Sequence, residues 1–586
     1  MADYSDASAD ASEIWKRRHT AAHVMAQAVL EIFPGAGLAI GPPIDDGFYY
    51  DFELPRTLTP DDLTDIEARM RRIKKENLPL ARSVRDRDEA IAFEQERGQK
   101  YKVELIHDLP DSETISYYTQ GSFTDLCRGP HVGSTGDIGV FKLERVAGAY
   151  WRADEHRAQL ERIYGVLFDT QEELDDYHRR LEEAKRRDHR VLGRQLGLFV
   201  FSDDIGSGIP LFLPKGEIIR HTMESYVRRL QTRYGYSHVW TGHLVKEELY
   251  RKSGHLENYV DAMFPPMVDP DGPTFRLKPM NCPSHMTLYN TQMHSYRDLP
   301  VRFAEFATLY RYEKSGELSG LTRVRSLTQD DCHIFCTPDQ IEQEFTLALK
   351  LIREALLRYG FTDYRVRLSL RDEDPESKYV KDDEKWTLAT QALRRSLDAN
   401  GVEYFEAVGE AAFYGPKADF ITRDVLGREW QISTIQVDFI QPSRLGCEYI
   451  GEDNHAHTPV VLHRAVTGST ERFLGVLIEH YAGAFPTWLA PVQAVVIPIV
   501  DRHHEYAHSV AERLKKAGFR VEVDARNESM RKKIAEAETQ KVPFMLVVGD
   551  RDIAAGNVSV RRRGQVDLGA LPFDDFLALI TEETAE

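Results

Sequence analysis

The chain has 586 residues, of which 42% are hydrophobic and 29% charged, and its formal net charge is −19. This length predicts about three or four domains, each with its own core. No run of about 18 apolar residues occurs, and the acidic N-terminus lacks the features of a signal peptide, so we expect no membrane span. Five scattered cysteines indicate a reducing compartment, the cytoplasm, rather than a disulfide framework.

The negative net charge does not exclude a nucleic-acid partner, because phosphate binding depends on the local potential. Residues 526–563 hold nine Lys and Arg against five Asp and Glu, and residues 178–195 hold seven against three. A solvated helix face explains either stretch equally well. Composition therefore permits RNA binding without indicating it.

The order of elements predicts an α+β protein with several domains. Residues 1–12 are small and polar, and we predict that they are disordered. Residues 13–33 have the apolar spacing of an amphipathic helix, which opens a first domain over residues 13–168. The highly charged residues 169–192 predict a single connecting helix.

The second half of the chain predicts two further domains. Residues 193–489 alternate helical patterns with β-rich runs such as Trp430 to Ile440, which is typical of an antiparallel sheet covered by helices. Prolines at 486 and 491 mark a boundary. The β-α-β-α-β order that follows predicts a small parallel-sheet domain over residues 490–586.

Two Cys/His pairs near the N-terminus share a spacing of four residues. They are His19 with His23, and Cys127 with His131. Residues four apart on a helix lie on one face, so two such pairs can converge on a small volume. A quartet of this kind suits zinc. It suits a metal-free hydrolytic pocket equally well, and the residues alone leave both interpretations open.

A second, dispersed set of motifs lies in the middle of the chain. The segments are MNCPSH from Met280, TLYRYEKSG from Thr308, TRVRSLTQDDCHIF from Thr322 and HRAVTGSTERF from His463. Their arginines suit phosphate and carboxylate oxygens, because a planar guanidinium binds either group in bidentate fashion. A lone arginine is usually a surface residue, and only the ordered set indicates a site.

In this order, the motifs resemble those of the threonyl-tRNA synthetase family from about residue 19 to the C-terminus. The resemblance implies an editing domain, a class II catalytic domain on an antiparallel sheet and a C-terminal α/β anticodon-binding domain. It also implies ATP-dependent ligation of L-threonine to tRNA(Thr) through a threonyl-adenylate, with hydrolysis of mischarged seryl-tRNA(Thr). A cytoplasmic homodimer without membrane contact is expected.

The resemblance assigns roles to the central residues, with Mg²⁺ bound together with ATP. The expected ligands of one zinc ion are Cys282, His333 and His463. The residues expected at the catalytic chemistry are Arg311, Glu313, Arg325 and Arg472. The residues expected to line the substrate pocket are Met280, Gln329, Asp331, Tyr414, Lys417, Gln431, Gln436 and Ser469.

The zinc and editing sites explain one another chemically. Three protein ligands leave an open zinc ion that the amino and hydroxyl groups of threonine can occupy, which excludes the isosteric valine. Serine lacks only a methyl group, worth about 1–3 kcal/mol, so editing must remove it. We expect a metal-free editing pocket with histidines near their ordinary pKa, formed by His19, His23, Cys127, His131, Asp125 and Lys102. Candidates for anticodon contacts are Arg526, Asn527 and Arg561.

Three positions depart from the family's pattern. Gly242 replaces the motif 1 proline, Ser319 stands where a His is common, and Leu327 replaces an aromatic residue at the end of motif 2. We also expect no ubiquitin-like domain, because only 18 residues precede His19. The departures motivate a second hypothesis, an RNA-binding paralogue without catalysis. A third, a stand-alone metallohydrolase, accounts for the N-terminal domain alone.

Overall fold

The computed structural model divides into two compact units, residues 1–182 and residues 183–586. It describes residues 12–585 apart from positions 155, 373, 375–376, 378 and 425–426. The predicted disorder of residues 1–12 therefore falls, except for Ser12, outside the described residues. Among the described helices, none combines the length and the apolar character that a membrane span needs.

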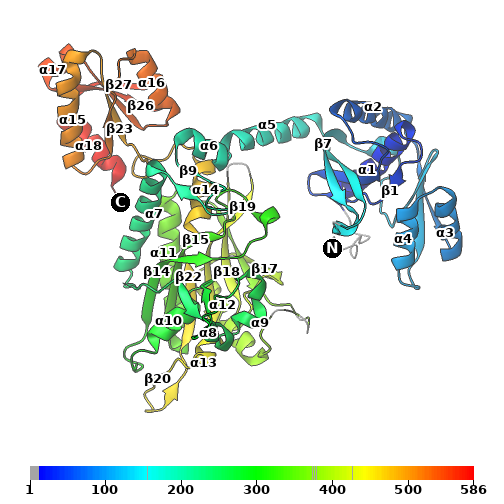
Figure 1. The fold of residues 1–586 in the computed structure, drawn as a ribbon, viewed down its shortest axis with the longest axis horizontal. Helices are drawn as coiled ribbons and strands as arrows, with labels where there is room; N and C mark the ends of the chain where they lie inside the picture. Colours follow the sequence, from blue (N-terminus) through cyan, green and yellow to red (C-terminus); the bar gives the residue numbers. More distant parts are fainter. Residues whose placement is uncertain are drawn as a thin grey trace. The chain divides into compact units, whose positions relative to one another are not determined.

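The first unit is built on helix α1 (Glu13–Ile32), which confirms the predicted N-terminal helix. The Ser12 side chain caps α1 by accepting the N–H of Trp15. One face of the helix packs against an antiparallel sheet in the order β1–β3–β8–β7, with β2 beside β3 (Figure 1). These elements are β1 (Gly37–Leu38), β2 (Pro43–Ile44), β3 (Gly47–Glu53), α2 (Pro60–Glu76), β7 (Val140–Tyr150) and β8 (Gln159–Phe168).

A smaller antiparallel sheet in the same unit carries the second Cys/His pair. Its order is β4–β5–β6, and Cys127 follows β6 directly. Its strands and the helices between them are β4 (Leu80–Arg85), α3 (Arg87–Glu96), α4 (Lys100–Asp108), β5 (Ile115–Gln120) and β6 (Phe123–Leu126).

The charged stretch forms two helices, so the prediction of one helix over residues 169–192 is wrong. Helix α5 (Gln171–Arg187) ends before Asp188, and α6 (His189–Leu196) begins after it. Asp188 has a non-helical ψ of 121°, and its side chain accepts the N–H of Arg190. An aspartate in this capping geometry starts a new helix instead of continuing the old one.

The second unit contains the predicted antiparallel sheet, with eight strands in the order β11–β14–β15–β22–β19–β18–β16–β17 (Figure 1). Only the β11–β14 and β16–β17 pairs are parallel. The strands are β11 (Ser237–His238), β14 (Val301–Tyr310), β15 (Ser326–Cys336), β16 (Tyr364–Leu370), β17 (Tyr404–Val408), β18 (Lys417–Arg423), β19 (Glu429–Asp438) and β22 (Val460–Ala465).

One face of this sheet packs on long helices, and the other is covered in part by helix α10 (Cys282–Tyr289) and carries the candidate site. Ile334, Ile435 and Leu462 belong to the main core together with residues of α7 (Pro214–Arg233), α11 (Ile341–Arg358), α12 (Asp383–Ala399) and α14 (Thr470–His480). Because strand side chains alternate between faces, their neighbours in sequence point away from that core. The remaining elements are β9 (Phe199–Val200), β10 (Leu211–Phe212), β12 (Leu244–Lys246), α8 (Glu247–Lys252), α9 (His255–Asn258), β13 (Phe275–Leu277), α10 (Cys282–Tyr289), α13 (Gln441–Arg444), β20 (Tyr449–Ile450) and β21 (Ala456–His457).

The C-terminal segment contains the predicted β-α-β-α-β order and more. Strands β24, β23 and β25 are parallel, but β26 and β27 extend the sheet in antiparallel fashion, which the sequence reading did not predict. The elements are β23 (Ala494–Pro498), α15 (His504–Lys516), β24 (Val521–Val523), α16 (Met530–Thr539), β25 (Phe544–Val548), α17 (Asp550–Ala555), β26 (Asn557–Arg562), β27 (Val566–Pro572) and α18 (Phe573–Thr584).

Candidate functional site

The strand register brings the central residues together. On β15, His333 lies directly opposite His463 of β22, which in turn lies opposite Gln436 of β19. Residues two apart on a strand share a face, so Gln329 and Asp331 point to the same side as His333. The register thus brings residues more than 100 positions apart in sequence to one face of the sheet.

Cys282 completes this group from the first position of α10. The sulfur and ring nitrogens of Cys282, His333 and His463 lie within 4.8 Å of one another, and all three residues are buried. Burial, together with the nearby Asp331 and Asp438, raises the pKa of the Cys282 thiol well above its ordinary value. Burial and the neighbouring imidazoles of His463 and His285 lower the pKa of His333 well below its ordinary value. The Cys282 thiol and the His333 imidazole are therefore both neutral in the metal-free protein.

A second layer of hydrogen bonds orients these ligands, and the sequence analysis missed it. His285 lies 2.8 Å from Nδ1 of His333, and Asp438 lies 2.9 Å from Nε2 of His463. Nε2 of His333 is buried without a hydrogen-bond partner. Behind His285, burial would raise the pKa of Glu305, but hydrogen bonds from His285, Asn281 and the N–H of Thr241 lower it to about 2. The position of His285 one helical turn after Cys282 was a signal for this layer.

A cavity of about 270 Å³ opens onto the metal-type ligands. It contains most of the predicted pocket residues, namely Met280, Cys282, Arg311, Gln329, Asp331, Tyr414, Lys417, Gln436 and His463. Asn281 and Thr434 also line the cavity and were not predicted. Burial, with the carboxylates of Asp330 and Glu305 nearby, raises the pKa of Asp331 to about 8.

Arg311 is the predicted arginine that reaches the cavity. Its backbone N–H donates to the carbonyl of Arg325, and its side-chain Nε is buried without a hydrogen-bond partner. Glu313 instead pairs with Arg323, whose Nε lies 2.8 Å away, and Arg325 donates to the carbonyl of Glu313. Arg311 therefore lines the cavity with a side-chain Nε that no other group of the described residues binds.

Three other predicted residues lie outside the lining of the cavity. Ser469 caps α14 by accepting the N–H of Arg472, whose Nε donates to the carbonyl of Thr322 in the motif 2 loop. Gln431 donates to Asp419 over 2.7 Å. The assignment of Arg472 to the catalytic chemistry, and of Ser469 and Gln431 to the substrate pocket, stays a prediction.

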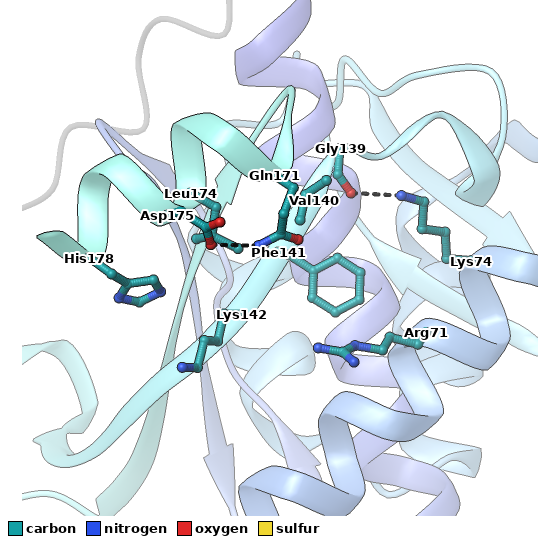
Figure 2. Close-up of a pocket in the computed structure, with 10 residues that line it drawn as sticks. All are labelled: Arg71, Lys74, Gly139, Val140, Phe141, Lys142, Gln171, Leu174, Asp175 and His178. Carbon is teal, nitrogen blue, oxygen red and sulfur yellow. Dashed lines mark hydrogen bonds between the residues drawn. The ribbon is translucent and has the colours of Figure 1, made fainter.

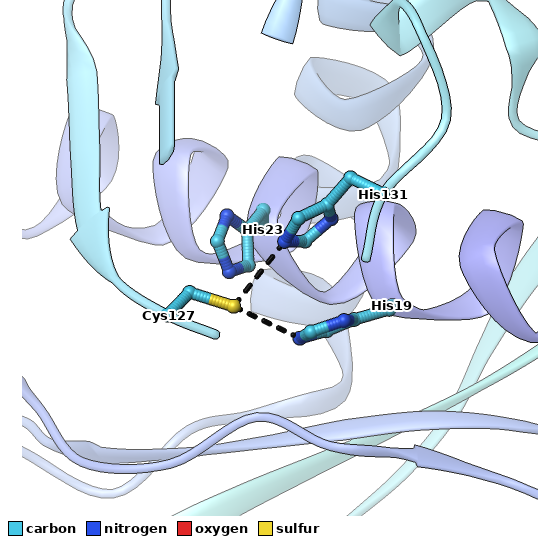
Figure 3. A group of neighbouring side chains, drawn as sticks. All are labelled: His19, His23, Cys127 and His131. Atoms are coloured by element: carbon cyan, nitrogen blue, oxygen red, sulfur yellow. Dashed lines mark hydrogen bonds between the residues drawn. The ribbon is translucent and has the colours of Figure 1, made fainter. Parts of the chain in front are cut away.

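The N-terminal quartet also converges, from α1 and the segment after β6. Figure 3 shows His19, His23, Cys127 and His131 pointing toward one another, with Cys127 Sγ 3.3 Å from Nε2 of both His19 and His131. Nδ1 of His19 lies 3.1 Å from the carbonyl of Pro130, which can only accept, so that nitrogen carries the proton. The remaining lone pair of His19, on Nε2, faces the thiol.

The tautomer of His131 is fixed in the same way. Thr20 donates its hydroxyl proton to the carbonyl of Lys16, so its oxygen accepts from Nδ1 of His131, 3.1 Å away. Nε2 of His131 therefore also presents a lone pair to Cys127. Two neutral proton acceptors meet at one thiol, an arrangement suited either to proton transfer or to a metal.

The charge state of the quartet differs from expectation. Burial lowers the pKa of His19 to about 3, with repulsion from His23 adding to the effect, and burial lowers the pKa of His23 to about 4. The expectation of an ordinary histidine pKa is therefore wrong, because His19 and His23 are buried. Burial likewise raises the pKa of Cys127 to about 12, so this cysteine is a protonated thiol and not a nucleophile.

An ion pair lies beside the quartet and includes a residue that the sequence analysis missed. Lys102 Nζ lies 2.7 Å from Asp125, and the Tyr50 hydroxyl donates to the other oxygen of Asp125 over 2.6 Å. Burial would raise the pKa of Asp125, but the charges of Lys102 and His23 and these hydrogen bonds lower it. The carboxylate of Asp125 thus lies 3.8 Å from Nε2 of His23. Because Lys102 carries the opposite charge, the ion pair adds no net charge beside the quartet.

A separate hollow of about 400 Å³ lies between α2, β7 and α5 (Figure 2). Its basic side chains are partly engaged, because Lys74 donates to the carbonyl of Gly139 and Arg71 pairs with Glu67. No predicted site residue lines this hollow, and we assign no chemistry to it.

The predicted anticodon residues do not form one cluster. Arg526 and Asn527 follow β24, whereas Arg561 lies on β26, and strands β23 and β25 run between them. Arg526 is paired with Asp524 and Glu536 at 2.6 Å each, and Arg561 with Asp567 at 3.3 Å. Asn527 is exposed.

Comparisons with known proteins agree with this architecture. Residues 266–481 match the tRNA synthetase class II core domain (G, H, P, S and T), and residues 493–583 match an anticodon binding domain. Residues 115–164 match the threonyl and alanyl tRNA synthetase second additional domain. The last of these matches lies in the first compact unit, and the other two lie in the second.

Relatives that align with almost the whole chain show which family it belongs to. The threonine–tRNA ligase of Rubrobacter xylanophilus is 64% identical over 560 residues, which cover 95% of this chain and 87% of the relative. The chain belongs to the threonyl-tRNA synthetase family. The Thermus thermophilus ligase is 52% identical over 577 residues, covering 96% of this chain and 87% of that one.

Solved structures support the same family. The RNA binding domain of threonyl-tRNA synthetase from Cryptosporidium parvum has a TM-score of 0.64 and 36% identity, covering 68% of this chain and 98% of that structure. A prolyl-tRNA synthetase from Giardia lamblia, 19% identical with a TM-score of 0.53, covers 69% of this chain and 81% of that structure and shows a shared fold alone.

The lowered histidine pKa values predict the pH dependence of seryl-tRNA hydrolysis. Imidazoles with pKa values of about 3 and about 4 stay neutral as the pH falls, and they lose their proton-accepting form only near those values. We expect the enzymatic rate, corrected for spontaneous hydrolysis, to show no histidine titration between about pH 5 and about pH 8. An inflection near the ordinary histidine pKa would contradict the neutral quartet.

Proposed function

We propose that the chain activates threonine in the central cavity and hydrolyses seryl-tRNA at the N-terminal quartet. As a member of its family, it is a class II enzyme that joins threonine to tRNA with ATP, and this chemistry needs Mg²⁺ with the nucleotide. The assignment of threonine activation to the central cavity rests on one observation. His333 and His463 face each other beside Cys282, and Arg311 lines the same cavity as Cys282 and His463.

The three central side chains fit one zinc ion. Their ligand atoms lie close together, and Nε2 of buried His333 has no other hydrogen-bond partner. Three nitrogen and sulfur ligands are typical of a zinc site that remains open to substrate. When bound, zinc supplies a Lewis acid that the amino and hydroxyl groups of threonine recognise, so valine is rejected.

The surrounding side chains orient the reacting groups. The free guanidinium of Arg311 binds oxygens of the α-phosphate and of the threonine carboxylate as the adenylate forms. Glu313 accepts from the adenine amino group, and Arg325 and Arg472 support the nucleotide from the motif 2 loop and α14. Asp331 and Gln329 lie near the hydroxyl group of the bound threonine. Arg526, Asn527 and Arg561 are candidates for contacts with the anticodon.

The domain boundaries, the location and the assembly belong to the same proposal. Residues 13–168 form the editing domain, 193–489 the catalytic domain and 490–586 the anticodon-binding domain. The cytoplasm supplies ATP, threonine and tRNA(Thr), and its reducing conditions suit the five free cysteines.

Zinc content and threonine activation test the central site. We expect about one zinc ion per chain in the wild type. Replacing Cys282 by Ala should remove this zinc and lower threonine-dependent ATP–pyrophosphate exchange at least about 100-fold, because an open zinc site needs all three protein ligands. The matched control is C447A, since Cys447 is another buried cysteine outside the group. Full exchange by zinc-free protein would contradict the metal role. A second zinc that survives in C282A would place a metal in the quartet.

In the editing pocket, we propose hydrolysis without a metal. The lone pair on Nε2 of one imidazole, of His19 or His131, accepts a proton from the attacking water, while Cys127 donates its thiol hydrogen bond to the other. As the ester bond breaks, the same imidazole returns the proton to the ribose oxygen that leaves, which releases serine and free tRNA. The Lys102–Asp125 pair, held by Tyr50, orients His23 and the substrate. A neutral quartet suits an ester substrate because no buried charge has to be displaced.

Replacing His23 by Ala should separate the two activities. We expect hydrolysis of seryl-tRNA(Thr) to fall at least about 100-fold, because His23 lies between the Asp125 carboxylate and the other imidazoles, and misplaced catalytic groups cost factors of this size. Threonine activation should stay unchanged and seryl-tRNA should accumulate. The control variant is H178A, which removes a histidine of the same unit that lies at the hollow of Figure 2. Equal loss of hydrolysis in H178A, or none in H23A, would contradict the assignment.

The motif 1 segment around Gly242 supports a homodimer. Trp240 is 73% exposed and Leu244 53% exposed, an unusual presentation of large apolar side chains on one short segment. A Cβ at Gly242 would meet only the carbonyl of Leu244, at 3.9 Å, so the departure from proline is not required by packing within the chain. A second copy of the chain would cover this segment.

Replacing Trp240 by Glu should therefore favour the monomer, because a charge would be buried in the interface. Light scattering after size-exclusion chromatography measures the mass directly. The control is V566E, which introduces the same charge at an exposed apolar residue of β27. A wild-type monomer, or an unchanged dimer in W240E, would contradict the motif 1 interface.

A further inference from the structure

A buried histidine outside both clusters joins three distant parts of the catalytic unit. His189 is the first residue of α6 and is 4% exposed. Its Nδ1 lies 2.7 Å from Oε1 of Glu479 in α14, 290 positions away in sequence. Leu321, in the motif 2 loop between β14 and β15, donates its backbone N–H to Nε2 over 3.0 Å. One imidazole thus connects the start of α6, the loop and α14.

The partners of His189 determine its tautomer. A backbone N–H can only donate, so Nε2 carries the lone pair and Nδ1 carries the proton that Glu479 accepts. Burial would raise the pKa of Glu479, but hydrogen bonds from the His189 side chain and backbone, with the charge of Arg428, lower it. Although Asp188 also lies within reach of both groups, the two ring nitrogens of His189 are already used, which argues against a metal here.

The contact of His189 with the loop is close and specific. Gly320 has a φ of +49°, and a Cβ there would lie 2.2 Å from Nε2 of His189. Only glycine therefore allows the imidazole to reach the N–H of Leu321 at this point. Leu321 itself is completely buried.

The same part of the loop contacts α14 beyond this histidine. Arg472 donates from Nε to the carbonyl of Thr322 over 3.1 Å, and a Cβ at Gly475 would lie 3.4 Å from Leu321. The next loop residue, Arg323, pairs with Glu313. Fixing Leu321 thus also limits the positions that Arg323 and Glu313 can take.

We propose that His189 is a positioning residue that holds the motif 2 loop in its ATP-binding arrangement. It does so as a neutral imidazole that connects the Leu321 N–H to the Glu479 carboxylate. His189 contacts no substrate, and its effect reaches ATP through the loop. The inference rests on the proposed role of this loop in ATP binding.

Two substitutions separate the two hydrogen bonds of His189. In H189Q the side-chain oxygen can take the place of Nε2 and accept from Leu321, whereas in H189N the side-chain amide can take the place of Nδ1 and donate to Glu479. H189N therefore leaves the buried N–H of Leu321 without an acceptor. The two variants change the same position and remove the same ring.

Threonine-dependent ATP–pyrophosphate exchange by the full chain measures the effect. We expect the KM for ATP to rise about tenfold in H189N, equivalent to about 1.4 kcal/mol, with the KM for threonine unchanged. H189Q should stay within about twofold of the wild type. A merely structural role would lower kcat alike in both variants, through a smaller folded fraction, and leave both KM values unchanged. That result would overturn the proposal.

Hydrogen exchange tests the anchor without relying on activity. In the full chain without substrates, we expect a peptide containing Leu321 to lose protection in H189N and keep it in H189Q. Equal protection in both variants would overturn the anchor. If the anchor is confirmed but wild-type protein shows no threonine-dependent exchange, the proposed function fails and the role in ATP binding fails with it.

Discussion

The pairing register of β15 with β22 and β19 is the constraint on which the central site depends. It sets His333 opposite His463, and His463 opposite Gln436, on the face of the sheet opposite the main helical core. A shift by one residue would turn these side chains into the core and bring Ile334 and Leu462 to the cavity. The burial of those apolar neighbours therefore stabilises the geometry of the ligands.

The two Cys/His groups use the same residue types in different surroundings. In the central group, His285 and Asp438 bind the outer nitrogens of the ligands, and a cavity with arginine and carboxylate groups opens beside them. In the N-terminal quartet, Thr20 and the Pro130 carbonyl fix the tautomers, and both Nε2 atoms face a protonated thiol. Both groups therefore have hydrogen bonds to their outer nitrogens, and the chemical type of the partner distinguishes them: an imidazole and a carboxylate in the central group, a hydroxyl and a carbonyl in the quartet.

The motif 2 loop obtains its position from outside the sheet. Its ends continue β14 and β15, but its central residues contact α14 and the first residue of α6. The buried imidazole of His189 has a hydrogen-bond partner on each nitrogen, so it restricts the loop more than an apolar contact would. The second helix of the charged connector is thus part of the catalytic unit, which explains why Asp188 interrupts the connector at that point.

The sequence by itself determined the family, the α+β architecture, the N-terminal helix and half of the residues that line the central cavity, because ordered motifs and strand periodicity are local properties of the chain. It did not determine the break at Asp188, the antiparallel strands β26 and β27, or the roles of Tyr50, His189 and His285. It also misjudged the histidine pKa values of the quartet. These features depend on burial and on hydrogen bonds between distant segments, which only the tertiary structure decided.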